Sequence, residues 1–157
     1  CRFVDPEHPE LGLVFDGRVT EDFKLDSGTW VSVGTLRPEV LAACSPYLSD
    51  GVIAGQDKSA ICALFWPAPA ALGALEGDAM AKLADLVSDR LAIFNRTAGG
   101  SSRRVARFVL LTEPPSIDAG EITDKGYINQ RATLERRRHI VEDLYAPQPS
   151  RRVIVVP

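Results

Sequence analysis

The chemistry that this 157-residue sequence could carry is best sought among its lysines. There are only four: Lys24, Lys58, Lys82 and Lys125. Lys125 closes a ten-residue loop, residues 116–125, and Gly126 follows it. Because glycine is conformationally free, a lysine at this position can reach out of its own domain and place an ammonium charge in another. From these residues alone, an exposed lysine in a surface turn is the simpler interpretation.

Other reactive patterns are missing from the sequence. It has no GxSxG, no glycine-rich phosphate loop ending in GK[ST] and no metal-ligand spacing, so we expect no metal site. The cysteines, Cys1, Cys44 and Cys62, are odd in number and lack CxxC spacing, which argues against disulfides and zinc and favours a cytoplasmic protein. His8 and His139 are predicted to be solvated surface residues.

Composition indicates one ordinary globular domain. Hydrophobic residues make up 45% of the chain and charged residues 25%, enough for one buried core. The net charge of −3 gives no reason to expect nucleic acid or an anionic membrane as a partner. No apolar run approaches the ~20 residues of a membrane span. Since the chain begins with Cys1 and has no signal-peptide pattern, we expect a piece of a longer protein.

Extended segments predominate in the first part of the chain. Apolar residues 11–15, a tight-turn signal at Asp16-Gly17 and residues 19–25 predict an antiparallel hairpin. Residues 29–33 are β-rich and lie between two glycines. Residues 38–44 then predict a short helix with Pro38 in its first turn.

The middle of the chain predicts a second hairpin and a long helix. Two compact apolar runs, 51–55 and 60–66, have the pattern of strands covered on both faces. The alanine-rich residues 68–77 predict a loop, and Asp78 is a candidate N-cap. The helix that follows has an apolar stripe at i, i+3, i+4, i+7 spacing, made by Met80, Leu83, Ala84, Val87, Leu91 and Phe94.

The last part predicts a strand at 105–111, a polar loop to Lys125 and a helix over 128–145. The run Arg136-Arg137-Arg138 in that helix is predicted to be a solvated face. Residues 153–156 form a short β-prone tail. This order of elements predicts an α+β domain with a small mixed sheet and flanking helices.

Two segments resemble motifs of the adenylate-forming acyl- and aryl-CoA synthetases. Residues 17–24, GRVTEDFK, resemble the GRxK(D/E)xIK segment that joins the two domains of this superfamily. Residues 121–130, EITDKGYINQ, resemble its TxxGK region, which holds the adenylation lysine. The order and spacing of the motifs make the resemblance nearly full-length. It implies the C-terminal lid domain of such an enzyme, with an N-terminal two-stranded hinge hairpin.

The resemblance also implies a reaction and a division of the chain. Residues 1–20 would be the end of the N-terminal domain and the approach to the hinge, and 21–157 the lid. The full-length enzyme would join a carboxylic acid to ATP, with Mg²⁺, to give acyl-AMP and pyrophosphate, and CoA would then displace AMP. Its partners would be that N-terminal domain, the acid, ATP and CoA. The fragment alone would hold none of these small molecules and would be nearly inactive.

Site roles follow from the resemblance residue by residue. Lys125 would be the catalytic lysine of adenylation. Glu21 would be the hinge, and Arg18 just before it would contact the ribose of the nucleotide. Gly28 and Trp30 would bind CoA, with Gly28 facing the pantetheine after the lid rotates.

Finer features leave alternatives open. Residues 28–34 and 121–130 look most like the feruloyl-CoA synthetases, which indicates a hydroxycinnamate-type acid. One alternative is a non-catalytic interaction module that uses Trp30, Trp66 and the arginine run as a docking surface. Another is an adenylation domain that transfers its acyl group to a carrier-protein thiol.

Overall fold

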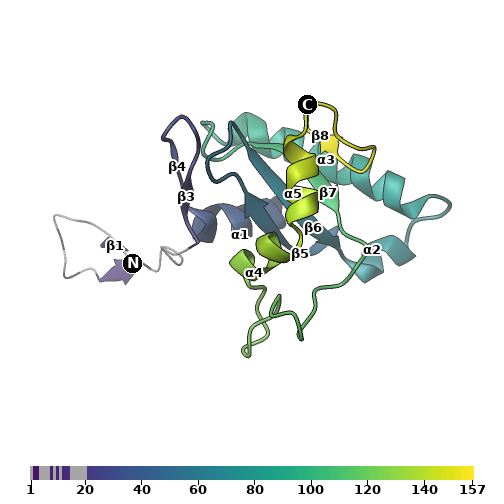
Figure 1. Ribbon diagram of the computed structural model, residues 1–157, viewed down its shortest axis with the longest axis horizontal. Coiled ribbons are helices and arrows are strands. Elements are labelled where there is room, and N and C mark those ends of the chain that lie inside the picture. The colour runs from purple at the N-terminus through teal and green to yellow at the C-terminus, as the bar shows by residue number, and fades with distance from the viewer. Residues whose placement is uncertain (1, 4–7, 9, 11, 15–20) are drawn as a thin grey trace.

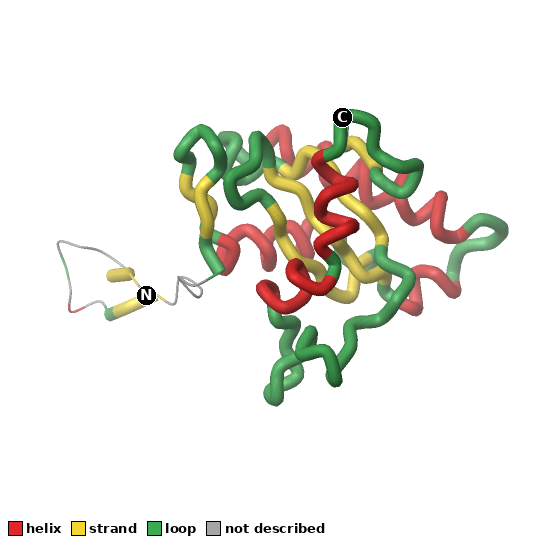
Figure 2. Tube along the Cα trace, in the orientation of Figure 1, coloured by secondary structure: helices red, strands yellow, loops and turns green. Residues whose placement is uncertain are grey.

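The computed structural model describes residues 2–3, 8, 10, 12–14 and 21–157. Its main sheet has four strands in the order β5-β6-β7-β8 (Figures 1 and 2). These strands are β5 (Leu48–Ala54), β6 (Ile61–Pro67), β7 (Val105–Leu110) and β8 (Ile154–Val155). β6 pairs antiparallel with β5 and parallel with β7, and β8 is antiparallel to β7. The sheet is therefore mixed, as predicted.

Helices cover both faces of this sheet. The helices are α1 (Val33–Ala43) and α3 (Ala79–Thr97) on one face, and α4 (Gln130–Arg136) and α5 (Arg138–Tyr145) on the other. In β6, Phe65 joins the core beneath α1 and α3, whereas its neighbours Leu64 and Trp66 join the core beneath α4 and α5. Successive strand residues point to opposite faces, so an unbroken apolar run marks a strand buried on both sides. The predicted α+β domain with flanking helices is confirmed.

The N-terminal strands pair differently from the prediction. β2 (Leu13–Val14) pairs with β1 (Arg2–Phe3), and β3 (Phe23–Lys24) pairs with β4 (Trp30–Val31). The expected hairpin between residues 11–15 and 19–25 is therefore wrong, and its Asp16-Gly17 turn lies outside the described residues. The hairpin that packs on the domain is formed by β3 and β4 instead. Its second strand, β4, covers only two residues of the predicted strand 29–33.

Helix α1 begins earlier than residue 38, the predicted start. Its cap acceptor is the Oδ1 atom of Asp22, which receives a hydrogen bond from the Val33 N–H at 2.9 Å. Pro38 lies inside the helix, not in its first turn. Val33 and Leu36 are buried in the core, and this packing outweighs the missing N–H of proline.

Two further predictions were only partly right. The predicted loop 68–77 contains a short helix, α2 (Pro69–Gly73). The predicted helix 128–145 is broken at Arg137, which separates α4 from α5. Asp78 caps α3 as expected, since its Oδ1 atom accepts a hydrogen bond from the Ala81 N–H at 3.1 Å. Among the described residues, no helix is both long and apolar enough to cross a membrane.

Candidate functional site

The loop between β7 and α4 ends in a tight hairpin that presents Lys125. We call residues 121–129 the lysine hairpin. The Thr123 N–H bonds to the Tyr127 C=O at 2.8 Å, and the Gly126 N–H bonds to the Thr123 C=O at 2.9 Å. Gly126 has a φ of 79°, the left-handed conformation that favours glycine in such three-residue turns. Lys125 is thereby fixed at the tip of the turn.

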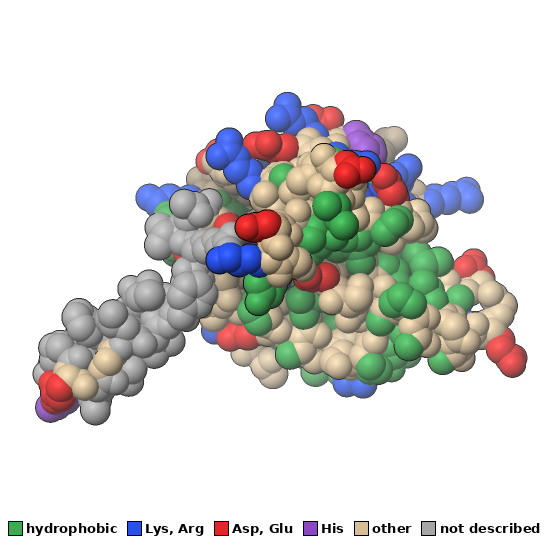
Figure 3. Space-filling model, turned by 90° about the horizontal axis from the view of Figure 1, so that it is seen from below, with side chains coloured by type: hydrophobic (Ala, Val, Ile, Leu, Met, Phe, Trp, Pro, Cys, Tyr) green, Lys and Arg blue, Asp and Glu red, His purple; other side chains and the backbone are tan. Residues whose placement is uncertain are grey.

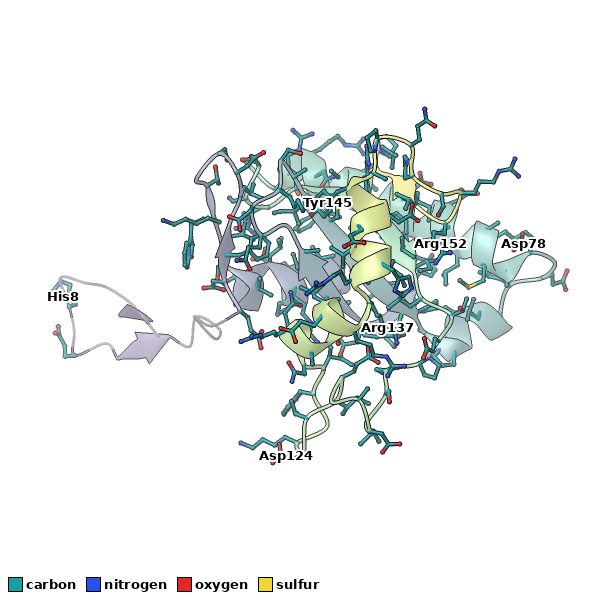
Figure 4. The ribbon with its side chains drawn as sticks, viewed as in Figure 1. His8, Asp78, Asp124, Arg137, Tyr145 and Arg152 are labelled. Atoms are coloured by element: carbon teal, nitrogen blue, oxygen red, sulfur yellow. The ribbon has the colours of Figure 1, made fainter. Side chains whose placement is uncertain are left out.

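Lys125 is exposed and has no hydrogen bond, ion pair or ring contact with any residue in the described part of the chain. The other lysines each contact a neighbour: Lys24 Nζ lies 5.9 Å from the Trp30 ring, Lys58 Nζ lies 5.3 Å from the Tyr145 ring, and Lys82 Nζ donates to the Glu76 C=O at 2.6 Å. Figure 4 places Asp124, the residue before Lys125, at the far end of the loop from the helices. Of the four lysines, Lys125 is therefore the one without a contact to a neighbouring group in the described part of the chain.

The base of the lysine hairpin is a buried ion pair between Glu121 and Arg137. Glu121 has no exposed surface, and its Oε1 and Oε2 atoms accept hydrogen bonds from Arg137 Nε at 2.7 Å and Nη2 at 3.1 Å. The same carboxylate accepts the Ser116 N–H at 2.8 Å. Arg137 Nη2 also donates to the Pro114 C=O at 3.2 Å, and its guanidinium lies 5.4 Å from the Trp66 ring centre. This pair closes the loop at its base.

The predicted solvated face of Arg136-Arg137-Arg138 is thus wrong at its middle residue. Arg136 and Arg138 are exposed, but Arg137 retains only 3% of its accessible surface. The backbone leaves helical geometry at Arg137, with φ −95° and ψ 26°, so this side chain does not follow the outer face of one continuous helix. It turns inward to meet Glu121.

The environment of Glu121 keeps its carboxylate charged. Burial by itself would raise the pKa of Glu121, but the hydrogen bonds from Arg137 and from the Ser116 N–H outweigh that effect and hold the pKa below its usual range. Arg136 Nη1 adds a further positive charge 3.6 Å from Glu121 Oε2. Glu121 and Arg137 are therefore a true ion pair at neutral pH.

Gln130 ties the end of the lysine hairpin to the edge of the sheet. Its Oε1 atom accepts a hydrogen bond from the Ile53 N–H at 3.0 Å, and its Nε2 donates to the Ile53 C=O. β5 is an edge strand, so this buried side-chain amide supplies the pairing that another strand would give. Next to it, Asn129 caps α4 by accepting the Ala132 N–H at 3.2 Å.

The predicted CoA contacts, Gly28 and Trp30, lie on the β3–β4 hairpin. The Leu25 N–H bonds to the Thr29 C=O at 2.9 Å, and the Gly28 N–H bonds to the Leu25 C=O at 2.9 Å. Gly28 has a φ of 81°, and a Cβ there would meet no atom within 4 Å. Glycine is therefore needed for the backbone conformation. Trp30 is 50% exposed.

The predicted hinge, Glu21, directly precedes two residues that contact the body of the domain. Asp22 is bonded to the start of α1, and Phe23 is buried in the core. Glu21 itself is half-buried in a turn. The predicted nucleotide contact, Arg18, lies outside the described residues. Asp22 and Phe23 thus hold this end of the described chain to the body of the domain.

A cavity of about 590 Å³ runs between the hinge end and the lysine hairpin. Glu21 lines it at one side, and Tyr127 of the lysine hairpin at the other. Between them, Arg37 and Asp50 form an ion pair at 2.6 Å. Figure 3, seen from the side on which the lysine hairpin projects, shows apolar side chains exposed on this face among charged ones. Glu21 and the lysine hairpin thus line the same cavity.

The two hairpins lie at opposite ends of the sheet. The β3–β4 hairpin rests on the turn between β5 and β6, where the Asp26 N–H bonds to the Lys58 C=O at 3.0 Å. The lysine hairpin lies beyond the other end of β6, after β7 has run parallel to it. In Figure 1 the β3–β4 hairpin lies at the upper left and the loop that carries the lysine hairpin lies at the bottom. One end therefore offers an ammonium, and the other an exposed indole. Within the described residues, no group of three or more His, Cys, Asp or Glu could hold a metal ion.

Residues 33–149 match the family of AMP-binding enzyme C-terminal domains. The match runs from α1 past α5 and includes the lysine hairpin, while the hinge and the β3–β4 hairpin precede it. Because it spans most of the chain, this protein belongs to that family. No curated protein matches the chain.

Solved structures with the same fold include adenylation domains of carboxylic acid reductases. The A domain from Segniliparus rugosus, in complex with AMP and a co-purified carboxylic acid, is 26% identical, with a TM-score of 0.68 over 90% of this chain and 22% of that one. The A-PCP didomain from the same organism, in complex with AMP, is 25% identical, with a TM-score of 0.64 over 92% and 19%. The adenylation domain of the carboxylate reductase from Mycobacterium chelonae is 25% identical, with a TM-score of 0.71 over 91% and 22%. This chain thus spans about a fifth of each.

Proposed function

We propose that this chain is the lid of an ATP-dependent acid–CoA ligase and that Lys125 acts in its first half-reaction. In that step a carboxylate oxygen attacks the α-phosphorus of ATP, and the bond to pyrophosphate breaks. Negative charge then crowds around the reacting phosphorus, and an ammonium between the carboxylate and phosphate oxygens stabilises it. The observation that carries the proposal is Lys125, exposed on an anchored turn and without a partner among the described residues.

The second half-reaction requires the lysine hairpin to withdraw. A thiol attacks the acyl carbon and AMP leaves, so the acceptor must reach the position that Lys125 occupied. Rotation at Glu21, with residues 1–20 remaining with the N-terminal domain and 21–157 moving, would achieve this. Asp22 is bonded to the start of α1, so the proposed pivot would lie directly before the body of the domain. Arg18 is proposed to contact the ribose of the nucleotide.

Rotation would bring the β3–β4 hairpin toward the acceptor. We propose that pantetheine passes Gly28, where no side chain intrudes, and that Trp30 offers an apolar face to CoA. Lys24, near the indole of Trp30, adds positive charge that suits a phosphate-bearing ligand. The full-length enzyme would use ATP and CoA as substrates and Mg²⁺ with the nucleotide.

The proposed acid is a hydroxycinnamate of the feruloyl type. Support comes from residues 28–34 and 121–130, whose sequences look most like that group of synthetases. The pocket that selects the acid would lie in the N-terminal domain. ATP–pyrophosphate exchange by the full-length enzyme, compared across hydroxycinnamates, benzoates and fatty acids, tests this assignment, and preference for a fatty acid contradicts it.

The role of Lys125 is tested by separating the half-reactions in the full-length enzyme. We expect Lys125→Ala to lower acyl-AMP formation by about 10²–10³. Thioester formation from supplied acyl-AMP should change little, because the lysine hairpin has then withdrawn. Lys82→Ala, which removes an ammonium bonded to the Glu76 C=O on a remote helix, is the matched control. Equal loss of both half-reactions in the Lys125 variant would contradict the role.

A second candidate is adenylation followed by transfer to a carrier-protein thiol. The similarity to carboxylic acid reductase domains, one of them solved as an A-PCP didomain, favours it. Both candidates use the same first step and differ in the acceptor. Incubating the acyl-AMP-loaded enzyme with CoA or with phosphopantetheinylated carrier protein distinguishes them by which thiol is acylated.

A further inference from the structure

Stability alone does not account for the buried ion pair beneath the lysine hairpin. Glu121 and Arg137 keep 0% and 3% of their accessible surface. Taking two charges out of water is so unfavourable that an apolar pair of similar volume often serves a fold equally well. What an ion pair adds is direction, because a guanidinium holds a carboxylate in one fixed orientation. A buried ion pair at this position therefore indicates that the orientation of the loop around Glu121 matters.

Glu121 controls both strands of the lysine hairpin. Its side chain holds the start of the loop through the Ser116 N–H, and its own N–H bonds to the Ser116 C=O at 2.9 Å. Its C=O accepts the Asn129 N–H at 2.8 Å, which fixes the returning strand. From there the hairpin continues through the Ile122–Ile128 bridge to the turn. A shift of Glu121 therefore moves the turn as a unit.

Arg137 connects this base to the body of the domain. Besides Glu121, it binds the Pro114 C=O on the outgoing part of the loop. Trp66 of β6 lies under its guanidinium, and the Trp66 Nε1–H donates to the Glu113 C=O at 3.0 Å. Figure 4 shows Arg137 at the helix break, with Asp124 at the opposite end of the loop. The contacts thus run from the sheet through Arg137 and Glu121 to the turn that carries Lys125.

We propose that Glu121 and Arg137 are positioning residues for the Lys125 ammonium. This inference rests on the proposed role of Lys125 in adenylation. Without an anchor, the tip of this long loop would be free to move. A misplacement of the ammonium by about 1 Å can lower a rate by about 10². The ion pair prevents this by fixing the hairpin at its base, while the tip stays free to enter another domain.

The test uses the full-length enzyme and both half-reactions. We expect Glu121→Gln to lower the rate constant of acyl-AMP formation by about 10-fold or more while thioester formation from supplied acyl-AMP stays near wild type. Glu135→Gln is the matched control, because it makes the same change in an exposed carboxylate of α4 that pairs with Arg131. Arg137→Lys, which keeps the charge but loses the fork geometry, should reproduce the selective loss if Glu121→Gln does not fold.

A double variant separates positioning from general structure. In a Lys125→Ala background there is no ammonium left to position, so adding Glu121→Gln should not lower acyl-AMP formation further. Independent multiplication of the two losses, or equal loss of both half-reactions in Glu121→Gln and Arg137→Lys, would overturn the proposal. A Lys125→Ala variant without a selective adenylation defect would instead refute the function on which the proposal rests.

Discussion

The β3–β4 hairpin and the lysine hairpin contain the same turn at opposite ends of one sheet. In each, the first residue of a five-residue segment bonds through its N–H to the fifth and through its C=O to the fourth. The fourth residue is glycine in both, with φ 81° at Gly28 and 79° at Gly126. Aspartate follows the first residue in both segments, Leu25-Asp26-Ser27-Gly28-Thr29 and Thr123-Asp124-Lys125-Gly126-Tyr127.

The two turns differ in what holds them. The β3–β4 turn is anchored by apolar burial and backbone bonds, because Leu25 is buried and the Asp26 N–H bonds to the Lys58 C=O. The lysine turn lies at the end of a long loop and is anchored by the Glu121–Arg137 pair and the Gln130 amide. Apolar contacts are non-directional, whereas charged hydrogen bonds fix an angle. The turn proposed to place a charge is the one with directional anchors.

The largest effect on stability is expected from Arg137→Ala. Removing the arginine leaves the fully buried Glu121 carboxylate without its partner, which should lower the free energy of unfolding by about 3–5 kcal/mol. Urea denaturation of this chain measures the change. Arg131→Ala breaks an exposed pair with Glu135 and should have little effect. If both variants lowered the free energy of unfolding equally, the buried Glu121–Arg137 pair would stabilise the domain no more than the exposed pair does.

At the other turn, Leu25→Ala should be nearly as damaging for a different reason. It opens a cavity beside Phe23 and Gly55 and should lower the free energy of unfolding by about 2–5 kcal/mol. This loss should be the same near neutral pH and in mild acid, because no ionisable group is involved. If the free energy of unfolding lost in this variant depended strongly on pH, the β3–β4 turn would not be anchored by apolar burial alone, as proposed.

A smaller effect is the acid sensitivity of the lysine-hairpin anchor. The pKa of Glu121 is lower in the folded chain than its ordinary value of 4.5, so the unfolded chain binds more protons in that range. The stabilisation is fully present above about pH 4.5 and is lost as pH falls from there toward the lower, folded-state pKa. The difference in unfolding free energy between wild type and Glu121→Gln should therefore narrow below about pH 4.5. A difference that is constant with pH would contradict this.

Periodicity predicted the parts of the fold that bury apolar surface. The strands around residues 51–55 and 60–66 and the helix after Asp78 are present because their patterns report directly which side chains leave water. The start of α1 was missed because the acceptor for its first N–H comes from Asp22, eleven residues away. Local patterns do not register such a partner.

Lys125, at the tip of the lysine hairpin, could be predicted from the sequence, but the Glu121–Arg137 pair at its base was not. Lys125 is followed by a glycine and resembles a known motif, so its own segment carries the signal. Glu121 and Arg137 are sixteen residues apart and meet only because the helix breaks at Arg137, between α4 and α5. One signal was available: Arg137 precedes Ile140 and Leu144 by three and seven residues, on the apolar stripe of α5. An arginine on that stripe indicates a buried partner.

The most direct test of the account is one substitution made in both turns of the full-length enzyme. Gly28→Ala and Gly126→Ala impose the same strain, about 1–2 kcal/mol for a left-handed residue with a Cβ, and neither meets a neighbouring atom. Both half-reactions are then measured for each variant. We predict that Gly126→Ala slows acyl-AMP formation and spares thioester formation from supplied acyl-AMP, whereas Gly28→Ala does the reverse. Equal defects of the two variants in both half-reactions would contradict the assignment of one turn to each step.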